Sequence, residues 1–426
     1  MKNDLNIFLN KKILVYGLGK SGLSTFNFLK SKNEVFLYDD FLQKNKKIID
    51  YRILLKKKFD YIIISPGIDK DKCKLSKFLK KNSKKIYTDL DVFNAFFKND
   101  CITITGTNGK STTCQLLYEI LLKQKYDVRL VGNIGNPILS TKKIKPKTIF
   151  VVEASSYQLE YSKIFKSKYA AILNISPDHI ERHKSFRNYI KAKLRLITNQ
   201  TKNSIAFIKQ DNFIIKKELH KKKLKCKLEK VKIDNFSKIF TKLKNKYFLT
   251  EANKENLSFV LSIAEKLRLN KKLTFRTVKK FKGLKYRQQI IYKKSKFLII
   301  NDSKSTSFSS SIGILKVYPN IFWLLGGVYK KGDKFNLPKK YHHNIKAFIF
   351  GKNKKFFNDQ LKGKIKYENF KDLDKAFKKI LSITNKQKLV DKTILFSPSA
   401  ASFDSFKNFE DRGFYFNRLV KRYLNG

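Results

Sequence analysis

The residues with the clearest chemical signal form a glycine-rich stretch, TGTNGKST, at positions 105–112. It joins a predicted buried strand at 101–105 to a predicted helix at 111–122 with an apolar face. Glycines let backbone N–H groups approach phosphate oxygens, the helix N-terminus adds partial positive charge, and a lysine neutralises the β and γ oxygens of a nucleotide. A serine hydroxyl at this position can reach a magnesium ion. The pattern therefore predicts a nucleotide-phosphate site formed by Gly106, Thr107, Asn108, Gly109, Lys110, Ser111 and Thr112.

The spacing of this motif leaves an alternative open. Two residues separate Gly106 from Gly109, whereas the general P-loop pattern has four between its glycines. A glycine turn without a ligand would also join a strand to a helix. We favour the phosphate site because strand and helix lie where the binding mechanism needs them.

A second glycine motif lies near the N-terminus. Gly17, Gly19 and Gly22 form G-x-G-x-x-G after a predicted strand, and the next strand ends at Asp39 and Asp40. This pattern is typical of a Rossmann-like fold that holds a pyrophosphate at a helix N-terminus. Taken alone it fits an NAD-dependent dehydrogenase, another pyrophosphate ligand, or a turn with no ligand.

Polar side chains follow further predicted strands of the first half. Glu153 ends the buried run 148–153, and His179, beside Asp178, follows a strand predicted to end at residue 176. A carboxylate placed downstream of a phosphate loop suits a magnesium ion, although it could instead cap the next helix. Helix 186–198 carries Lys191, Lys193 and Arg195, which look like an ordinary basic face, and His183 lacks the placement of a ligand.

The last third alternates buried strands, predicted at 296–302, 321–327, 345–351 and 393–398, with helical spans. This alternation predicts a parallel, doubly wound sheet. Polar clusters follow three of the strands, and such clusters at carboxyl strand ends indicate an anion site. Between the halves, the lysine-dense segment 209–247 predicts short strands and exposed loops, and residues 251–256 are expected to precede a helix.

Composition bounds the possible classes of function. The chain has 426 residues, a formal net charge of +60 and four scattered cysteines, for which we expect reduced core thiols. The charge could indicate nucleic-acid binding, but lysines are spread over the whole length and arginine is sparse, so a compositional bias explains it better. With no membrane-length apolar run and no apolar secretory core, we expect a cytoplasmic protein without a membrane or nucleic-acid partner.

The motifs together resemble the Mur ligase superfamily, whose members use ATP to join an amino acid to a carboxylate. TGTNGKST is similar to its nucleotide loop. Three further motifs, E-x-S-S-Y-Q-L at 153–159, N-D-S-K-x-T at 301–306 and S-P-x-x-A-S-x-D-x-F-x-N-F-x-x-R-G at 397–413, are similar to the branch that adds D-glutamate. At least six motifs occur in the family's order over about residues 11–420. A sister ligase using another amino acid, or adding glutamate to folate, is the main alternative within the family.

The resemblance implies a fold and a set of ligands. The fold would be α/β in three domains: a Rossmann-like UDP-sugar domain (1–92), a central P-loop ATPase-like domain (93–285) and a C-terminal Rossmann-like amino-acid domain (286–426). The substrates would be ATP, UDP-N-acetylmuramoyl-L-alanine and D-glutamate, with Mg²⁺ as cofactor. The reaction would pass through an acyl phosphate, and the enzyme would be a monomer. Domain closure would then assemble the site.

The resemblance also assigns roles to residues. The catalytic group would comprise Lys110, Lys193 and His179, and the metal group Ser111, Glu153, His179 and Lys193, the last as a carbamate. The phosphate loop would be joined in ATP binding by Asn256, Arg287 and Asp302. The UDP-sugar contacts would be Gly17, Leu18, Gly19, Lys20, Ser21, Asp39, Gly67 and Asn133. The D-glutamate contacts would be Lys304, Thr306, Ser402 and Phe409.

Two positions depart from the family pattern. Ala252 stands where the family's G-x-H-N-x-x-N motif has histidine, and Tyr286 stands where its G-L-x-H-R motif has histidine. The contribution of both histidines to nucleotide binding is therefore in doubt for this chain.

Overall fold

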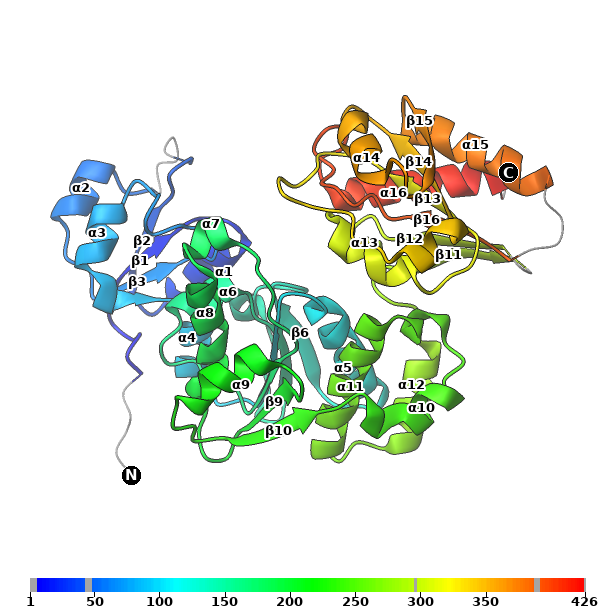
Figure 1. Cartoon of the computed structure of the whole chain (residues 1–426). Coiled ribbons are helices and arrows are strands. Elements are labelled where there is room, and N and C mark those ends of the chain that lie inside the picture. The colour runs from blue at the N-terminus through cyan, green and yellow to red at the C-terminus, as the bar shows by residue number, and fades with distance from the viewer. Residues whose placement is uncertain (1–5, 43–47, 295–296, 387–390, 425–426) are drawn as a thin grey trace. The chain divides into compact units, whose positions relative to one another are not determined.

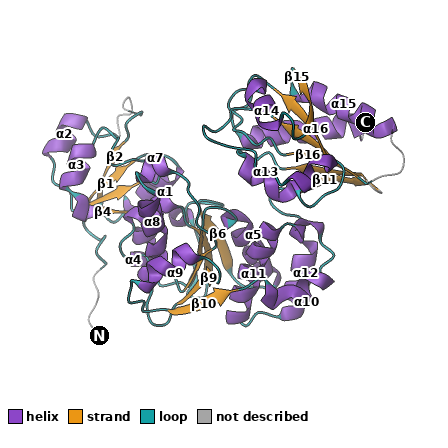
Figure 2. Cartoon of the chain, in the orientation of Figure 1, coloured by secondary structure: helices purple, strands orange, loops and turns teal. Residues whose placement is uncertain are grey.

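The computed structural model describes the chain except for residues 1–5, 43–47, 295–296, 387–390 and 425–426. The described residues form two compact units, the first made of 1–238 and 255–278 and the second of 239–254 and 279–426. They contain three sheets, two in the first unit and one in the second. Figure 1 follows the chain through them, and Figure 2 shows helices packed around the strands of each sheet. The predicted α/β class is thus confirmed.

The first sheet is parallel, with the strand order β2-β1-β3-β4. Tyr16 pairs with both Tyr38 and Ile64, so three strands end at the same edge. The glycine turn after β1 and the Ser-Pro-Gly turn after β3 therefore start from neighbouring points. Its elements are β1 (Lys12–Tyr16), α1 (Lys20–Leu29), β2 (Glu34–Tyr38), α2 (Tyr51–Lys56), β3 (Tyr61–Ile64), α3 (Ser76–Lys81), β4 (Ile86–Tyr87) and α4 (Asp89–Phe96).

The second sheet is also parallel, with the order β10-β9-β8-β5-β7-β6. Strand β5 lies between β7 and β8, and all its residues are buried, as expected for an inner strand of a parallel sheet that helices cover on both faces. Its strands are β5 (Cys101–Thr105), β6 (Val128–Gly132), β7 (Ile149–Glu153), β8 (Tyr169–Ile172), β9 (Ile205–Lys209) and β10 (Lys227–Val231). The helices that follow these strands are α5 (Lys110–Lys123), α6 (Ser156–Tyr161), α7 (Ile180–His183), α8 (Phe186–Thr198), α9 (Phe213–His220), α10 (Ser237–Lys242), α11 (Glu251–Lys266) and α12 (Lys271–Lys280).

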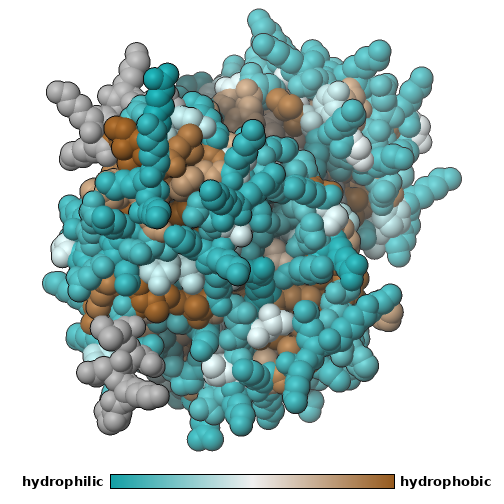
Figure 3. Space-filling model, turned by 90° about the vertical axis from the view of Figure 1, so that its left-hand side faces the viewer, coloured by the Kyte–Doolittle hydropathy of each residue, from teal (hydrophilic) through white to brown (hydrophobic). Residues whose placement is uncertain are grey.

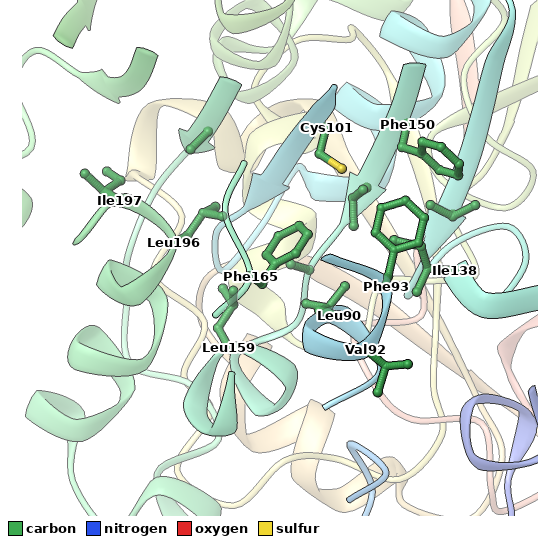
Figure 4. Packing of buried hydrophobic residues seen from close by; sticks show 14 of the residues in the cluster. Leu90, Val92, Phe93, Cys101, Ile138, Phe150, Leu159, Phe165, Leu196 and Ile197 are labelled. Atoms are coloured by element: carbon green, nitrogen blue, oxygen red, sulfur yellow. The ribbon is translucent and has the colours of Figure 1, made fainter. Parts of the chain in front are cut away.

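Helix α4 connects the cores of these two sheets. Leu90, Val92 and Phe93 are buried and belong to the same cluster as Cys101 and Phe150 of the second sheet (Figure 4). The rings of Phe93 and Phe150 meet edge to face with centroids 4.7 Å apart. The boundary predicted between residues 92 and 93 thus falls inside a helix, and the exact bounds of the three domains stay a prediction.

The third sheet has the order β11-β12-β16-β13-β14-β15, parallel except for the antiparallel edge pair β11 and β12. Its two faces are covered by separate apolar clusters, as a doubly wound sheet requires. The elements are β11 (Gln289–Lys294), β12 (Phe297–Asn301), α13 (Phe308–Leu315), β13 (Ile321–Leu325), β14 (Ile345–Phe350), α14 (Lys354–Leu361), β15 (Lys366–Phe370), α15 (Leu373–Lys386), β16 (Lys392–Phe396) and α16 (Phe409–Leu424).

Two local predictions were wrong. Segment 209–247 holds α9 and α10 in addition to β10, where only short strands and loops were expected. Asn253 and Asn256 lie within α11, which begins at Glu251, and not before the helix. Within the part of the chain that the structure describes, no helix is long and apolar enough to cross a bilayer.

Candidate active site

The loop between β5 and α5 adopts the conformation that its glycines were expected to allow. Gly109 has φ +85°, and a Cβ built on it would lie 2.0 Å from Oδ1 of Asn256. Only glycine fits between the loop and α11 at this point. The structure thus brings Asn256, predicted from the resemblance alone, against the phosphate loop.

The loop is also braced by Asn174, which lies just after β8, and by Tyr189 of α8. Asn174 accepts the backbone N–H of Thr107 with its carbonyl oxygen at 3.0 Å and that of Asn108 with Oδ1 at 2.9 Å. The hydroxyls of Thr107 and Tyr189 lie 2.9 Å apart. Asn174 and Tyr189 were not identified from the sequence, because neither stands in a glycine or charge pattern.

Two lysines converge on one carbonyl of this loop. Nζ of Lys110 donates to the Gly106 oxygen at 2.8 Å, and Nζ of Lys193 donates to the same oxygen at 2.9 Å. Lys193 is 1% exposed, and burial together with the charge of Lys110 lowers its pKa well below the ordinary value. A lowered pKa favours the uncharged form of the amine, which is the form that can react with carbon dioxide.

Glu153, at the end of β7, is a candidate metal-binding carboxylate. It is 1% exposed, its Oε1 accepts from Nδ2 of Asn133 at 2.8 Å, and its buried Oε2 has no hydrogen-bond partner. An unpaired buried carboxylate oxygen is costly unless a cation neutralises it. Glu153 and the phosphate-loop Ser111 therefore fit a magnesium ion, which typically takes one or two carboxylates plus phosphates and water.

Among the described residues, no three or more histidine, cysteine, aspartate or glutamate side chains are grouped so that they could hold a metal ion by themselves. A metal here would therefore depend on ligands of other types, such as nucleotide phosphates. That agrees with a site built around a bound nucleotide and not around a closed protein cage.

Two histidines flank Tyr157 in this region. His179 precedes α7 with φ +53°, its side chain is half exposed, and its ring centroid lies 5.1 Å from that of Tyr157. His183, set aside on sequence grounds, is 2% exposed and stacks on the same ring at 5.5 Å. Its Nε2 lies 3.0 Å from Oγ of Ser156, and its Nδ1 lies 3.5 Å from a carboxylate oxygen of Glu160.

Burial and the nearby positive charge of Arg182 lower the pKa of His183 to about 4. It is therefore neutral at physiological pH. His183 follows His179 by four residues, about one helical turn, and this spacing was the feature of the sequence that could have placed the two histidines on the same side.

The N-terminal glycine motif forms a tight turn at the edge of the first sheet. Gly17 has φ +90°, and a Cβ built on Gly22 would lie 1.8 Å from the carbonyl oxygen of Gly17. Oδ2 of Asp39 accepts the N–H of Leu18 at 2.7 Å, and Oγ of Ser65 donates to the Gly17 oxygen at 2.6 Å. The structure thus assembles part of the predicted UDP-sugar set.

The remaining members of that set are distributed as follows. Gly19, Lys20 and Ser21 lie at the start of α1, and around a Cβ on Gly19 or Gly67 there is open space. Asn133 is the exception, because it follows β6 and contacts Glu153 in the second sheet.

The second unit carries the predicted amino-acid residues at the carboxyl ends of β12 and β16. Nζ of Lys304 lies 3.8 Å from the ring centroid of Phe409, and Oγ of Ser303 donates to the Phe409 carbonyl at 2.9 Å. Ser402 is buried and Thr306 is exposed. Lys304 and Phe409 are therefore brought together.

Asp302 is a buried carboxylate beside these residues. It accepts from Oγ of Ser397 at 2.9 Å and from the N–H of Gln288 at 3.1 Å, and burial raises its pKa to about 7. Arg287 is also among the predicted nucleotide contacts, and its positive charge opposes this rise in the pKa of Asp302. Tyr286 stands where the family pattern has histidine. Its ring packs against Gly413, where a Cβ would lie 2.4 Å from Cδ1 of the tyrosine.

Arg412 lies within the motif at 397–413, but the sequence pattern assigned it no role. It is fully buried, and its guanidinium donates to the carbonyls of Ser303 and Ala400 at 2.8 and 2.9 Å. It therefore ties the segments after β12 and β16 to α16. Its place in the Arg-Gly pair that ends this motif was the feature of the sequence that could have marked it as a candidate.

Comparison with known proteins identifies the family. Residues 104–259 match the model of the Mur ligase middle domain. Over its full length the chain is similar to proteins named UDP-N-acetylmuramoylalanine–D-glutamate ligase. That of Rickettsia felis is 31% identical over 98% of this chain and 99% of the relative, and that of Buchnera aphidicola is 34% identical over 97% and 98%. The chain belongs to the Mur ligase family.

Solved structures of the family share the fold. The MurF ligase of Thermotoga maritima, solved with ADP, matches with a TM-score of 0.58 at 15% identity, covering 99% of this chain and 100% of that one. The UDP-N-acetylmuramate–alanine ligase MurC of the same organism matches with a TM-score of 0.55 at 16% identity, covering 98% and 100%. Membership in this ligase family leaves the dehydrogenase alternative without support.

Proposed function

We propose that this Mur ligase joins D-glutamate to UDP-N-acetylmuramoyl-L-alanine with the consumption of ATP, a step in the synthesis of peptidoglycan precursors. The observation that carries the proposal is the full-length similarity, at 31–34% identity, to ligases named for this reaction. The phosphate loop and the two lysines at its carbonyl supply the parts that such a reaction needs. Because ATP and UDP-sugars are cytoplasmic compounds, the enzyme would act there, as a monomer.

The reaction would proceed in two steps. The terminal carboxylate of the UDP-sugar-alanine attacks the γ-phosphorus of ATP, which releases ADP and gives an acyl phosphate. The amine of D-glutamate then attacks the acyl carbon, the carbon–oxygen bond to phosphate breaks, and the amine proton is lost. Neither step requires a protein nucleophile, so the protein acts by positioning and by charge.

The phosphate loop orients the triphosphate in this scheme. Backbone groups of Gly106–Thr112 and the N-terminus of α5 would hold its oxygens. Lys110 would leave the Gly106 carbonyl and follow the γ-phosphate, while Asn256 would contact the adenine. Arg287 and Asp302, in the second unit, would add contacts to the nucleotide, with Asp302 at the ribose.

Glu153, Ser111 and His179 would hold magnesium together with Lys193 as a carbamate. Magnesium would offset the negative charge that develops on the transferred phosphoryl group. A neutral Lys193 amine gains a carboxylate by reaction with carbon dioxide, which converts a buried base into an oxygen ligand with loss of one proton. The pKa depression of Lys193 supports this change, because a protonated amine cannot react.

The two remaining substrates would bind at the other two sheets. Gly17, Leu18, Gly19, Lys20, Ser21, Asp39 and Gly67 would hold the UDP end, and Asn133 the part of the molecule near the acyl group. Lys304, Thr306, Ser402 and Phe409 would hold D-glutamate. The pairing of a cationic Lys304 with the face of Phe409 supports this assignment, because it offers a carboxylate partner next to an apolar wall.

Product formation tests the proposal. We expect mass spectrometry to show a UDP-sugar product one glutamyl residue heavier, only when ATP, magnesium and D-glutamate are all present. Lys193→Ala should lower kcat by about a hundredfold or more, the usual scale for losing a preorganised charge at the reaction centre. The matched control is Lys191→Ala on the same helix, whose exposed side chain should be dispensable. Normal turnover by Lys193→Ala at saturating magnesium would exclude the carbamate, and no product with the wild type would exclude the ligase reaction.

A further inference from the structure

Arg182 joins two segments of the first unit that are far apart in the sequence. One terminal nitrogen of its guanidinium donates to the carbonyl oxygen of Ile68 at 2.7 Å, and the other donates to the hydroxyl of Tyr161 at 3.1 Å. Asp69 lies 3.3 Å from the same group, and Glu160 lies 3.8 Å from it. The side chain is only 10% exposed, so these contacts are largely shielded from water.

The Ile68 end of this bridge belongs to the wall of the glycine turn. Ile68 directly follows Gly67 in the turn after β3, and a Cβ on Gly17 would lie 2.8 Å from Cγ1 of Ile68. Ser65, from the same turn, donates to the Gly17 carbonyl. A shift of the Ile68 backbone would therefore move the turn that is proposed to hold the UDP end.

The other end of the bridge belongs to the segment that carries His179. Arg182 lies in α7, and its N–H donates to the His179 carbonyl at 3.1 Å. The centre of its guanidinium lies 5.3 Å from the centroid of the Tyr157 ring, and the His179 ring lies 5.1 Å from that same ring. Tyr157 is thus in contact with both the bridge and the histidine.

We propose that Arg182 is a positioning residue that sets the spacing between the glycine turn and His179. The inference rests on the proposed function, in which one substrate molecule reaches from the UDP-binding turn to the acyl-activating residues. A substrate that must meet both ends at once is bound well only when their separation matches its length. Arginine suits this role because its planar fork donates in two directions while its face packs on aromatic rings.

Substitution of Arg182 tests this role through a split between substrates. Arg182→Gln removes the charge and the fork, and we expect KM for UDP-N-acetylmuramoyl-L-alanine to rise about tenfold or more, the scale of losing a charge-assisted hydrogen bond. KM for ATP should change less than about twofold, since the phosphate loop is braced by Asn174 and Asn256 instead. Arg182→Lys, which keeps the charge but offers a single donor group, should give an intermediate rise.

The matched control is Lys184→Ala. Lys184 also links this segment to the N-terminal sheet, through an ion pair of 2.7 Å with Asp71, but its side chain is 64% exposed. An exposed pair contributes little, so we expect both KM values to stay within about twofold of wild type. Thermal unfolding of each variant establishes that it is folded at the assay temperature.

Four outcomes decide the matter. A selective rise in KM for the UDP substrate in both Arg182 variants supports the positioning role. Unchanged KM values in folded Arg182→Lys or Arg182→Gln overturn it, as does an equal rise for ATP and the UDP substrate. Wild-type enzyme that neither binds nor turns over the UDP substrate would instead refute the proposed function on which the inference rests.

Discussion

Lys191 and Lys193 show how burial separates side chains of the same type. They stand two residues apart on α8, yet Lys191 is exposed and Lys193 is 1% exposed at the phosphate loop. Residue chemistry alone predicted an ordinary basic face, and only the family resemblance singled out Lys193. A signal was present, because Lys193 falls on the helix stripe that also carries the buried Tyr189, Ile190 and Ile197. A lysine on an otherwise buried stripe is a functional candidate.

His183 yields a prediction that depends on pH. Its pKa in the folded protein is about 4, below the ordinary value of about 6.5. Between these values the unfolded chain binds more protons than the folded one, so the stability present above pH 6.5 falls as the pH drops toward 4. NMR titration should find one of the five histidines with a pKa near 4, and His183→Gln should remove that signal. Titration of every histidine between pH 6 and 7 would contradict the buried, neutral assignment.

At the scale of elements, Asp91 explains why α4 stays with the second sheet. Its Oδ2 accepts the backbone N–H of Thr88 at 3.0 Å and so caps the helix. Its Oδ1 accepts from the hydroxyl of Ser162 and from three consecutive backbone N–H groups, at distances of 2.8 to 3.0 Å. The side chain is fully buried, and a charge-assisted cluster of this kind holds the turn after α6 against α4.

Asp91→Asn should therefore destabilise the first unit. The amide has one acceptor oxygen, so either the cap or the three N–H groups lose their partner, and we expect a loss of about 2–4 kcal/mol in the free energy of unfolding. Urea unfolding followed by circular dichroism measures it. Asp100→Asn is the control, because the Asp100–Lys168 pair at 2.6 Å is half exposed and should contribute less than about 1 kcal/mol. Equal effects of the two substitutions would show that Asp91 is not an anchor.

Elements with strong apolar periodicity were predictable from the sequence, and lysine-dense ones were not. The strands β1, β5, β7, β13 and β14 were all expected, because each is rich in apolar and β-branched residues and is bounded by turn residues. Strand β15, with the sequence KYENF, and helix α9 were missed, because charged residues interrupt their patterns. The contacts of Asn174 and Arg412 depend on tertiary neighbours, which local patterns do not encode.

At the scale of the whole molecule, charge and function are separate matters. Hydrophilic side chains cover most of the face seen in Figure 3, as expected for a chain with a net charge of +60. Such a field attracts anionic nucleotides and substrates without specifying them. The order of motifs along the chain carried the specific information, and the full-length relatives bear out the family that this order indicated.

The amino acid that the enzyme accepts tests the central claim most directly. Phosphate release from ATP would be measured with UDP-N-acetylmuramoyl-L-alanine, magnesium and bicarbonate, while D-glutamate, L-glutamate, L-lysine and diaminopimelate are supplied in turn. We predict release that requires D-glutamate and stays at background with the other three. Release that is supported equally well by another of these amino acids would contradict the account.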